Sequence, residues 1–420
     1  MKLENVKGTQ DIMPEEKIAL NSIIDSLRES FELYGYNPLE TPAIEYLEVL
    51  ASKFAGGEEI LKEIYKLTDQ GKRELALRYD LTVPFARVVA MNPHVKKPFK
   101  RYQIDKVWRD GPIKLGRYRE FWQCDCDVVG VKSIAAEAEL LAMAKGFFEK
   151  LGLEISVRVN NRKLLAEMMA FAGVSEEMSN SAILSIDKLL KIKADGVEKE
   201  LIEKGLSEEV ADSVIEIISN NFEGIAKLLP GSKGVSELRE LMGYCSENGV
   251  EIDVEPTLAR GLAYYTGTIY EIFVKDGSFG GAIAAGGRYD TMITEFVSDG
   301  KDYPCVGISF GLSALKDALK KKELLDCRKS VVDVLVVSMS EDVAARKVTR
   351  ELRFAGVNTE LDLMGRNISK NLDFANKMGI RYVAIIGEDE AKEDKVTLKD
   401  MQEGNQEMIL VADVVNKVHE

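Results

Sequence analysis

Residues 121–129 read FWQCDCDVV, a run in which polar side chains recur at every second position before two valines. Such alternation is typical of a β-strand, because successive side chains of a strand point to opposite faces of the sheet. Gln123 and Asp127 are four residues apart, so a strand places both side chains on the same face. The run therefore predicts a strand of an antiparallel sheet with polar groups on one face.

Further alternating runs extend this prediction on both sides. Residues 74–78 and 100–104 precede the run, and residues 268–274 follow it. Residues 15–34 instead carry apolar side chains at helical spacing and end before a glycine, which predicts a helix. Residues 162–246 have a helical pattern throughout. The sheet is therefore expected to be split in sequence by a small helical insert.

The pattern changes again after the charged stretch at residues 316–329. Strands are then predicted at 331–339, 358–363 and 382–387, with helices between them at 341–354 and 368–378. This alternation is typical of a small α/β domain with a largely parallel sheet. Its first strand-to-helix turn carries no glycine-rich phosphate-binding motif, which argues against a nucleotide site there.

Together these patterns predict an α+β fold, in which helices flank an antiparallel sheet. The expected domains are a core in two parts, residues 1–161 and 247–325, a helical insertion at 162–246, and a C-terminal α/β domain at 331–420. A length of 420 residues suits several domains, since one domain usually takes roughly 100–200 residues.

Composition places the chain among ordinary globular proteins, with 45% hydrophobic and 30% charged residues. No stretch approaches the roughly 18 apolar residues that span a bilayer, and the first residues lack a signal-peptide core, so we expect a cytoplasmic protein. The five cysteines are an odd number, and the closest two, Cys124 and Cys126, lack the spacing of a zinc knuckle. We expect reduced thiols, with metal binding as the alternative.

Charge is distributed unevenly along the chain. The net charge is −14, yet residues 96–119 contain nine basic residues and only two acidic ones. Such a local excess favours anionic ligands. The only histidines are His94 and His419, which nearly excludes catalysis by a His-Asp pair or by a metal held by several histidines.

Two further segments carry residues suited to a ligand site. Arg109 and Arg119 end one predicted strand and begin the next, where guanidinium groups can clamp phosphates; an ordinary basic surface loop is the alternative. Residues 259–267, ARGLAYYTG, suit the wall of a small-molecule pocket, although the two tyrosines could be half-buried strand residues. The glycines at 280–287 allow close approach to a ligand or form a hairpin with a bulge.

Taken together, these segments resemble histidyl-tRNA synthetase, a class II aminoacyl-tRNA synthetase, in its archaeal and eukaryotic branch. The resemblance spans essentially the whole chain: residues 7–11 match the family's start, 40–42 its dimer-forming motif 1, 77–87 its substrate loop, 109–127 motif 2, 260–265 the histidine motif, 286–290 the companion of that motif, 306–312 motif 3, and 331–420 the anticodon-binding domain.

The resemblance implies a class II synthetase sheet and a histidine–tRNA ligase. Such an enzyme activates histidine with ATP to histidyl-adenylate and transfers the histidyl group to tRNA(His). It also implies a cytoplasmic homodimer that takes ATP with Mg²⁺ as a substrate complex, with no tightly bound cofactor, no metal held by the protein and no membrane partner.

The family's residue roles carry over where the motifs match. Asp80, Thr82 and Gln123 would hold the histidine ammonium, and Asp127 and Tyr264 the imidazole. Arg109 would bridge the histidine carboxylate and the ATP α-phosphate, with Arg260 on the opposite side of that phosphate. The implied catalytic residues are Arg109 and Arg260; the histidine-binding residues are Asp80, Thr82, Arg109, Gln123, Asp127, Arg260, Tyr264, Tyr265 and Tyr289; the ATP-binding residues are Arg109, Arg117 and Arg119.

Three positions depart from the family's pattern. Gly111 stands where motif 2 usually has Glu, so a carboxylate contact to adenine requires a substitute such as Asp110. Ala263 stands where the histidine motif often has Asp, and Ala314 replaces the usual Arg of motif 3. One alternative is a non-catalytic histidine-sensing paralogue, such as the regulatory subunit of ATP phosphoribosyltransferase, although that type lacks the C-terminal domain. A structural or scaffolding dimer is the other alternative.

Overall fold

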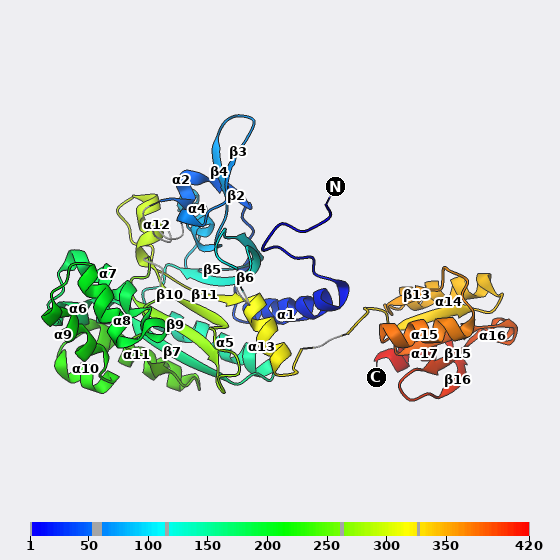
Figure 1. Cartoon of the computed structure of the whole chain (residues 1–420). Coiled ribbons are helices and arrows are strands. Elements are labelled where there is room, and N and C mark those ends of the chain that lie inside the picture. Colours follow the sequence, from blue (N-terminus) through cyan, green and yellow to red (C-terminus); the bar gives the residue numbers. More distant parts are fainter. Residues whose placement is uncertain (1, 53–60, 114–116, 261–263, 326–327, 420) are drawn as a thin grey trace. The chain divides into compact units, whose positions relative to one another are not determined.

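The computed structural model describes residues 2–52, 61–113, 117–260, 264–325 and 328–419. Cys327 and Ala263 lie outside these residues. The chain divides into two compact units, one made of Met1–Asp11 and Ile23–Leu325 and the other of Ile12–Ser22 and Asp326–Glu420 (Figure 1). We describe each unit by itself.

An eight-stranded sheet forms the centre of the larger unit. In spatial order it contains β1 (Asn37–Pro38), β5 (Phe99–Trp108), β6 (Glu120–Val129), β11 (Cys305–Gly311), β10 (Ala284–Arg288), β9 (Thr268–Val274), β7 (Ile155–Asn161) and β8 (Asp253–Val254). The six inner strands pair antiparallel, whereas β1 pairs parallel with β5 and β8 parallel with β7. The predicted antiparallel sheet is thus confirmed at its centre and is mixed at its edges.

The strand predicted at residues 74–78 belongs to a different sheet. It forms β4 (Glu74–Leu77), which pairs antiparallel with β2 (Ile44–Tyr46) and β3 (Lys66–Thr68). Its assignment to the main sheet was therefore wrong. Alternation along one strand reports which faces are buried but not which strands pair, because pairing depends on residues distant in the sequence.

Aromatic side chains form the core on one face of the main sheet. Phe310 of β11 lies 5.8 Å from Phe31 of α1 (Pro14–Leu33), measured between ring centroids. It also lies 5.4 Å from Phe147 and 5.8 Å from Phe148, both in α5 (Ala135–Lys150). All four rings are buried. Because neighbouring side chains of β11 alternate, Ser309 and Gly311 face the other side of the sheet.

Helices make up the predicted insertion and the remaining connections. Figure 1 shows the six helices of residues 162–247 gathered beside β7 and β9, namely α6 (Arg162–Phe171), α7 (Glu176–Ile186), α8 (Leu189–Glu203), α9 (Glu208–Ile218), α10 (Phe222–Leu228) and α11 (Lys233–Glu247). Further helices described in this unit are α2 (Leu47–Leu50), α4 (Thr82–Met91), α12 (Asp290–Val297) and α13 (Leu312–Lys321). None of the described helices is long and apolar enough to cross a membrane.

The smaller unit contains a five-stranded sheet with helices on both faces. Its elements are β12 (Val334–Ser338), α14 (Asp342–Phe354), β13 (Thr359–Leu361), α15 (Ile368–Met378), β14 (Tyr382–Ile386), α16 (Glu388–Glu393), β15 (Lys395–Asp400), β16 (Gln406–Leu410) and α17 (Val411–His419). One core cluster joins the sheet to α14 and α17, and another joins its opposite face to α15. This is the predicted α/β organisation.

The predicted largely parallel sheet is, however, a mixed one. Strands β13 and β14 pair parallel with β12, whereas β14 with β15 and β15 with β16 pair antiparallel. A short turn joins β15 to β16. Such a connection permits only an antiparallel pair, since parallel neighbours need a crossover of a dozen or more residues.

Candidate active site

A cavity of about 620 Å³ lies on the face of the main sheet away from the phenylalanine core. Its walls come from β6, β9, β10 and β11, from the start of α4, and from residues of the insertion and of the connecting segments. The described lining residues include Glu63, Tyr79, Asp80, Thr82, Arg109, Arg117, Phe121, Gln123, Asp125, Asp127, Asp187, Lys191, Arg260, Tyr264, Tyr265, Glu271, Tyr289 and Ser309.

Strand β6 supplies the polar floor of this cavity. Gln123, Asp125 and Asp127 occupy alternate positions and all face the cavity. Gln123 donates a hydrogen bond from Nε2 to Ser309 Oγ at 3.2 Å. Asp127 pairs in register with Gly307 of β11, where a Cβ would lie only 1.8 Å from Asp127 Oδ1. The glycine at 307 therefore leaves the space that the Asp127 carboxylate occupies.

The Asp127 carboxylate has partners on two neighbouring elements. Its Oδ2 lies 2.6 Å from Arg101 Nη2, and its Oδ1 accepts a hydrogen bond from the Tyr289 hydroxyl at 2.5 Å. All three side chains are buried. Burial raises the pKa of Asp127, while the Arg101 charge and the Tyr289 hydrogen bond oppose that rise.

Two more buried carboxylates face the cavity. Asp80 lies just before α4 and accepts a hydrogen bond from the Val83 backbone N–H at 3.1 Å. Burial raises the pKa of Asp80 to about 6, against the effects of that hydrogen bond and of Arg109 and Arg101. Burial also raises the pKa of Asp125 to about 7, although Arg101 lowers it. Asp125 Oδ1 is buried with no hydrogen-bond partner among the described residues.

Arg109 directs a positive charge into the same cavity. Its Nε donates to the Tyr79 carbonyl oxygen at 2.9 Å, and its guanidinium lies 5.2 Å from the centre of the Phe121 ring. These contacts fix the guanidinium plane. Arg117, also in the hairpin between β5 and β6, adds an exposed cation to the lining.

Arg260 contributes a second guanidinium from a strained backbone position. Its φ is 54°, in the left-handed region that residues other than glycine rarely adopt. The side chain lies 3.8 Å from Glu271 and 5.3 Å from the centre of the Tyr265 ring. Its Nη1 is buried without a hydrogen-bond partner among the described residues. A free buried donor of this kind suits an anionic ligand.

The structure brings together all but one of the site residues expected from the sequence. Arg119 is the exception, since it is absent from the described lining of the cavity. It pairs with Asp110 at 2.9 Å, and its aliphatic carbons pack where a Cβ on Gly8 would lie. The expected residues that do line the cavity are Asp80, Thr82, Arg109, Arg117, Gln123, Asp127, Arg260, Tyr264, Tyr265 and Tyr289.

Several lining residues were missed by sequence reasoning. Asp125 could have been found, because it shares the alternating face of Gln123 and Asp127. Glu63 and Lys191 carried no such signal, since they reach the cavity from segments distant in the sequence. A Cβ built on Gly111 would lie 2.7 Å from Glu63 Oε1, and the Asp110 backbone N–H donates to the Glu63 carbonyl oxygen at 2.8 Å. The Glu63 carboxylate thus lies beside Gly111.

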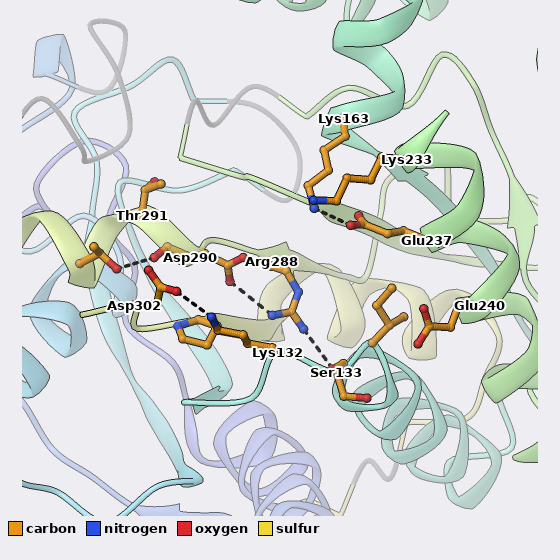
Figure 2. A pocket seen from close by; sticks show the side chains of 13 residues that line it. Lys132, Ser133, Lys163, Lys233, Glu237, Glu240, Arg288, Asp290, Thr291 and Asp302 are labelled. Atoms are coloured by element: carbon orange, nitrogen blue, oxygen red, sulfur yellow. Dashed lines mark hydrogen bonds and ion pairs between the residues drawn. The ribbon is translucent and has the colours of Figure 1, made fainter. Parts of the chain in front are cut away.

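A second cavity of the same unit, about 510 Å³, is shown in Figure 2. Four of its charged side chains form two ion pairs: Lys163 with Glu237 at 2.5 Å and Lys132 with Asp302 at 2.6 Å. Arg288, also in its lining, is paired with the buried Glu137 at 2.6 Å. This cavity is polar, but its ion pairs are formed within the protein.

Comparison with known proteins gives one consistent result. Residues 8–315 match the family model described as histidyl-tRNA synthetase, and residues 332–420 match that of an anticodon binding domain. A histidine–tRNA ligase 1 of Bacillus thuringiensis is 46% identical over 99% of this chain and 100% of that protein. A histidine–tRNA ligase of Gloeobacter violaceus is 37% identical over 98% of this chain and 97% of that protein.

Solved structures agree with these matches. The histidyl-tRNA synthetase of Nostoc superposes with a TM-score of 0.86 at 34% identity, covering 100% of this chain and 99% of that one. A Bacillus halodurans structure described as an ATP phosphoribosyltransferase regulatory subunit/histidyl-tRNA synthetase gives 0.75 at 22% identity, covering 92% of this chain and 99% of that one, which shows the shared fold. By its family match, by relatives aligned over nearly the full length and by its fold, the chain belongs to the histidyl-tRNA synthetase family.

Proposed function

We propose that the chain is a histidine–tRNA ligase whose active site is the 620 Å³ cavity. The observation that carries this proposal is the convergence of buried carboxylates with two arginines around one cavity, in a chain that matches the family over both of its domains. The carboxylates suit the ammonium and ring N–H groups of histidine, and the arginines suit the phosphates of ATP.

The proposed first step is histidine activation. A histidine carboxylate oxygen attacks the α-phosphorus of ATP, and the bond to the β-phosphate oxygen breaks to release pyrophosphate. Arg109 and Arg260 stabilise the negative charge that grows on the α-phosphate oxygens, an effect that is strong where water is excluded. In the second step a terminal ribose hydroxyl of the tRNA attacks the histidyl carbonyl carbon and AMP leaves. ATP enters as its Mg²⁺ complex.

Histidine selection is assigned to the floor of the cavity. Asp80, Thr82 and Gln123 hold the ammonium, while Asp127 and Tyr264 each hydrogen-bond one imidazole nitrogen. An amino acid without these ring nitrogens would leave buried polar groups unpaired, which gives strong discrimination. Tyr265 and Tyr289 complete the wall.

We also propose that Glu63 supplies the carboxylate that Gly111 lacks. Its carboxylate lies where a side chain at position 111 would begin, and it lines the cavity. Asp110, the other candidate, is already paired with Arg119 at 2.9 Å and accepts a hydrogen bond from the Tyr65 hydroxyl at 3.4 Å. Glu63 is therefore the better placed acceptor for an amino group of adenine.

The remaining positive charge for ATP comes from Arg117 and Lys191, the other described cations of the lining, in the absence of an arginine at Ala314. Residues 331–420 are assigned to the anticodon region of tRNA(His). Two chains are proposed to form a cytoplasmic homodimer through the segment around residues 40–42 that resembles motif 1.

Histidine-dependent exchange of pyrophosphate into ATP tests the activity directly, followed by charging of tRNA(His). The ligase should show both. A purely regulatory paralogue would bind histidine without exchange, and a scaffolding dimer would do neither. Histidine binding without exchange would favour the histidine-sensing alternative.

A further inference from the structure

Arg101 lies beside Asp127, next to the proposed histidine pocket. It is in β5, directly opposite Asp127 of β6 in the sheet register, and is not among the described lining residues of the cavity. Its side chain is only 1% exposed and that of Asp127 only 4%. The guanidinium also donates from Nη2 to the Leu81 carbonyl oxygen at 3.2 Å and lies 4.2 Å from the centre of the Phe85 ring. These contacts hold it in one place.

The carboxylates of the pocket share this guanidinium as a counter-ion. Arg101 favours the ionised forms of Asp80, Asp125 and Asp127, while the negative charge of Asp127 disfavours ionisation of the other two. Arg101 Nε and Nη1 have no hydrogen-bond partner among the described residues. Like charges that are buried close together cannot all remain ionised without a nearby cation.

We propose that Arg101 is a positioning residue for histidine recognition: it fixes the Asp127 carboxylate and supplies the buried positive charge that lets the pocket carboxylates accept hydrogen bonds from the substrate. This inference rests on the proposed function of the cavity. It assigns to Arg101 no contact with substrate, because Asp127 lies between the guanidinium and the imidazole position.

A consequence for pH dependence follows from the groups around Asp127. These are Arg101 from β5, Asp125 and Cys126 on its own strand, Cys305 of β11, Tyr270 of β9, and Asp80, Tyr265 and Tyr289 from the surrounding segments. Among these groups only Arg101 is a cation. Removing it raises the pKa of Asp127 further, so the protonated, non-accepting form persists to higher pH. As the pH falls, histidine recognition is then lost at a higher pH than in the unchanged protein.

The test compares Arg101→Met, Arg101→Lys and the unchanged protein in histidine-dependent pyrophosphate exchange between pH 5.5 and 8.5. In Arg101→Met, the acid limb of kcat/KM for histidine should move upward by about 1–3 pH units, the usual effect of one nearby charge. Histidine's own ionisation is the same in all the proteins and cancels. Arg101→Lys keeps the charge, so its acid limb should stay in place, while loss of the planar fork raises KM at every pH.

A matched control is Tyr102→Phe on the opposite face of the same strand. It removes the 2.7 Å hydrogen bond from the Tyr102 hydroxyl to Glu32 and should lower the melting temperature without moving the acid limb. A second measurement places Arg101→Met in an Asp127→Asn background. If Arg101 acts through Asp127, the double variant should be little worse than Asp127→Asn alone.

The outcomes separate this inference from the proposed function. If the unchanged protein shows no pyrophosphate exchange, the proposed function is wrong. Normal exchange with an acid limb that is unmoved in Arg101→Met would overturn the inference, as would additive losses in the double variant. Should Arg101→Met fail to fold, Arg101→Lys decides: an unchanged KM for histidine would show that the geometry at Asp127 does not depend on Arg101.

Discussion

The proposed active-site cavity and the cavity of Figure 2 differ in whether their charged and polar groups have partners within the protein. In Figure 2, Lys163 meets Glu237 and Lys132 meets Asp302, so these charges are neutralised by the protein. In the active site, polar atoms of Gln123, Asp125 and Arg260 are buried with no hydrogen-bond partner among the described residues. Since buried polar groups are normally paired, such atoms indicate where a ligand completes the structure. Cavity size alone would not distinguish the two.

The largest effect is expected at Arg260. Arg260→Ala removes the guanidinium that we propose acts on charge growing in the transition state, so the exchange rate should fall about 100–1000-fold, equivalent to about 2.7–4 kcal/mol. Histidine affinity, measured by calorimetry, should change much less. Arg158→Ala is the matched control, because Arg158 also stacks on an aromatic ring, Phe273 at 4.8 Å, yet is not among the described lining residues. Near-normal exchange by Arg260→Ala would falsify its assigned role.

A smaller and more selective loss is expected at Asp127. Asp127→Ala should weaken histidine binding about 10–100-fold, because a hydrogen bond to a charged group contributes about 1.5–3 kcal/mol. ATP binding should be unchanged, because no phosphate contact is assigned to this carboxylate. Calorimetry with each ligand separately measures both. Equal losses for histidine and ATP would mean that the substitution disturbs the whole cavity.

Glu63 sharpens the assignment at the ATP end. Glu63→Gln should raise the KM for ATP about 3–10-fold, because one hydrogen bond usually contributes about 0.5–1.5 kcal/mol of net stabilisation. The KM for histidine should be unchanged. Asp110→Asn is the paired control, since Asp110 pairs with Arg119. The reverse result, with ATP affected only by Asp110→Asn, would make Asp110 the substitute for the missing motif 2 carboxylate.

The smallest effect is expected in the cavity of Figure 2. Lys163→Met breaks a partly exposed ion pair with Glu237, so the free energy of unfolding should fall by less than about 1 kcal/mol. Both exchange and tRNA charging should be unaffected. Denaturant unfolding and the exchange assay measure these two quantities. A large loss of activity with unchanged stability would show that this cavity takes part in the reaction, and the contrast between the two cavities would fail.

Local patterns predicted the elements well but not their partners. The run at residues 121–129 lies within β6, and residues 268–274 are β9. In both runs the two-residue period of polar and apolar side chains follows the alternation of the two faces of the strand. The pairing of β4 in a separate sheet, and the antiparallel β15 and β16 in the smaller unit, depend on residues far along the chain or on turn length. A short window of sequence does not contain the distant partners of β4, whereas the short turn between β15 and β16 is itself local and is sufficient to predict their antiparallel pairing.

The same distinction holds for the site. The strand pattern predicted that Gln123 and Asp127 share a face, and the resemblance to the family's motifs implied their roles and those of the arginines. Arg101 and Glu63 were missed, since each matters through a neighbour on another element: Arg101 through Asp127 across the strand pair, and Glu63 through Gly111. Sequence patterns identify side chains that face a pocket, whereas the tertiary structure is needed to identify the groups that hold those side chains in place.

The position of β11 beside β6 also determines when the pocket comes into existence. Gln123 and Ser309 are bonded across these strands but stand 186 residues apart in the sequence. Strand pairs of such long range form late, because the intervening chain must first be brought together. During synthesis, Asp127 therefore meets Gly307 only after the whole insertion has emerged. Histidine bound at the proposed site would consequently stabilise the completed sheet and none of its shorter precursors, so the substrate would be a selective ligand of the finished fold.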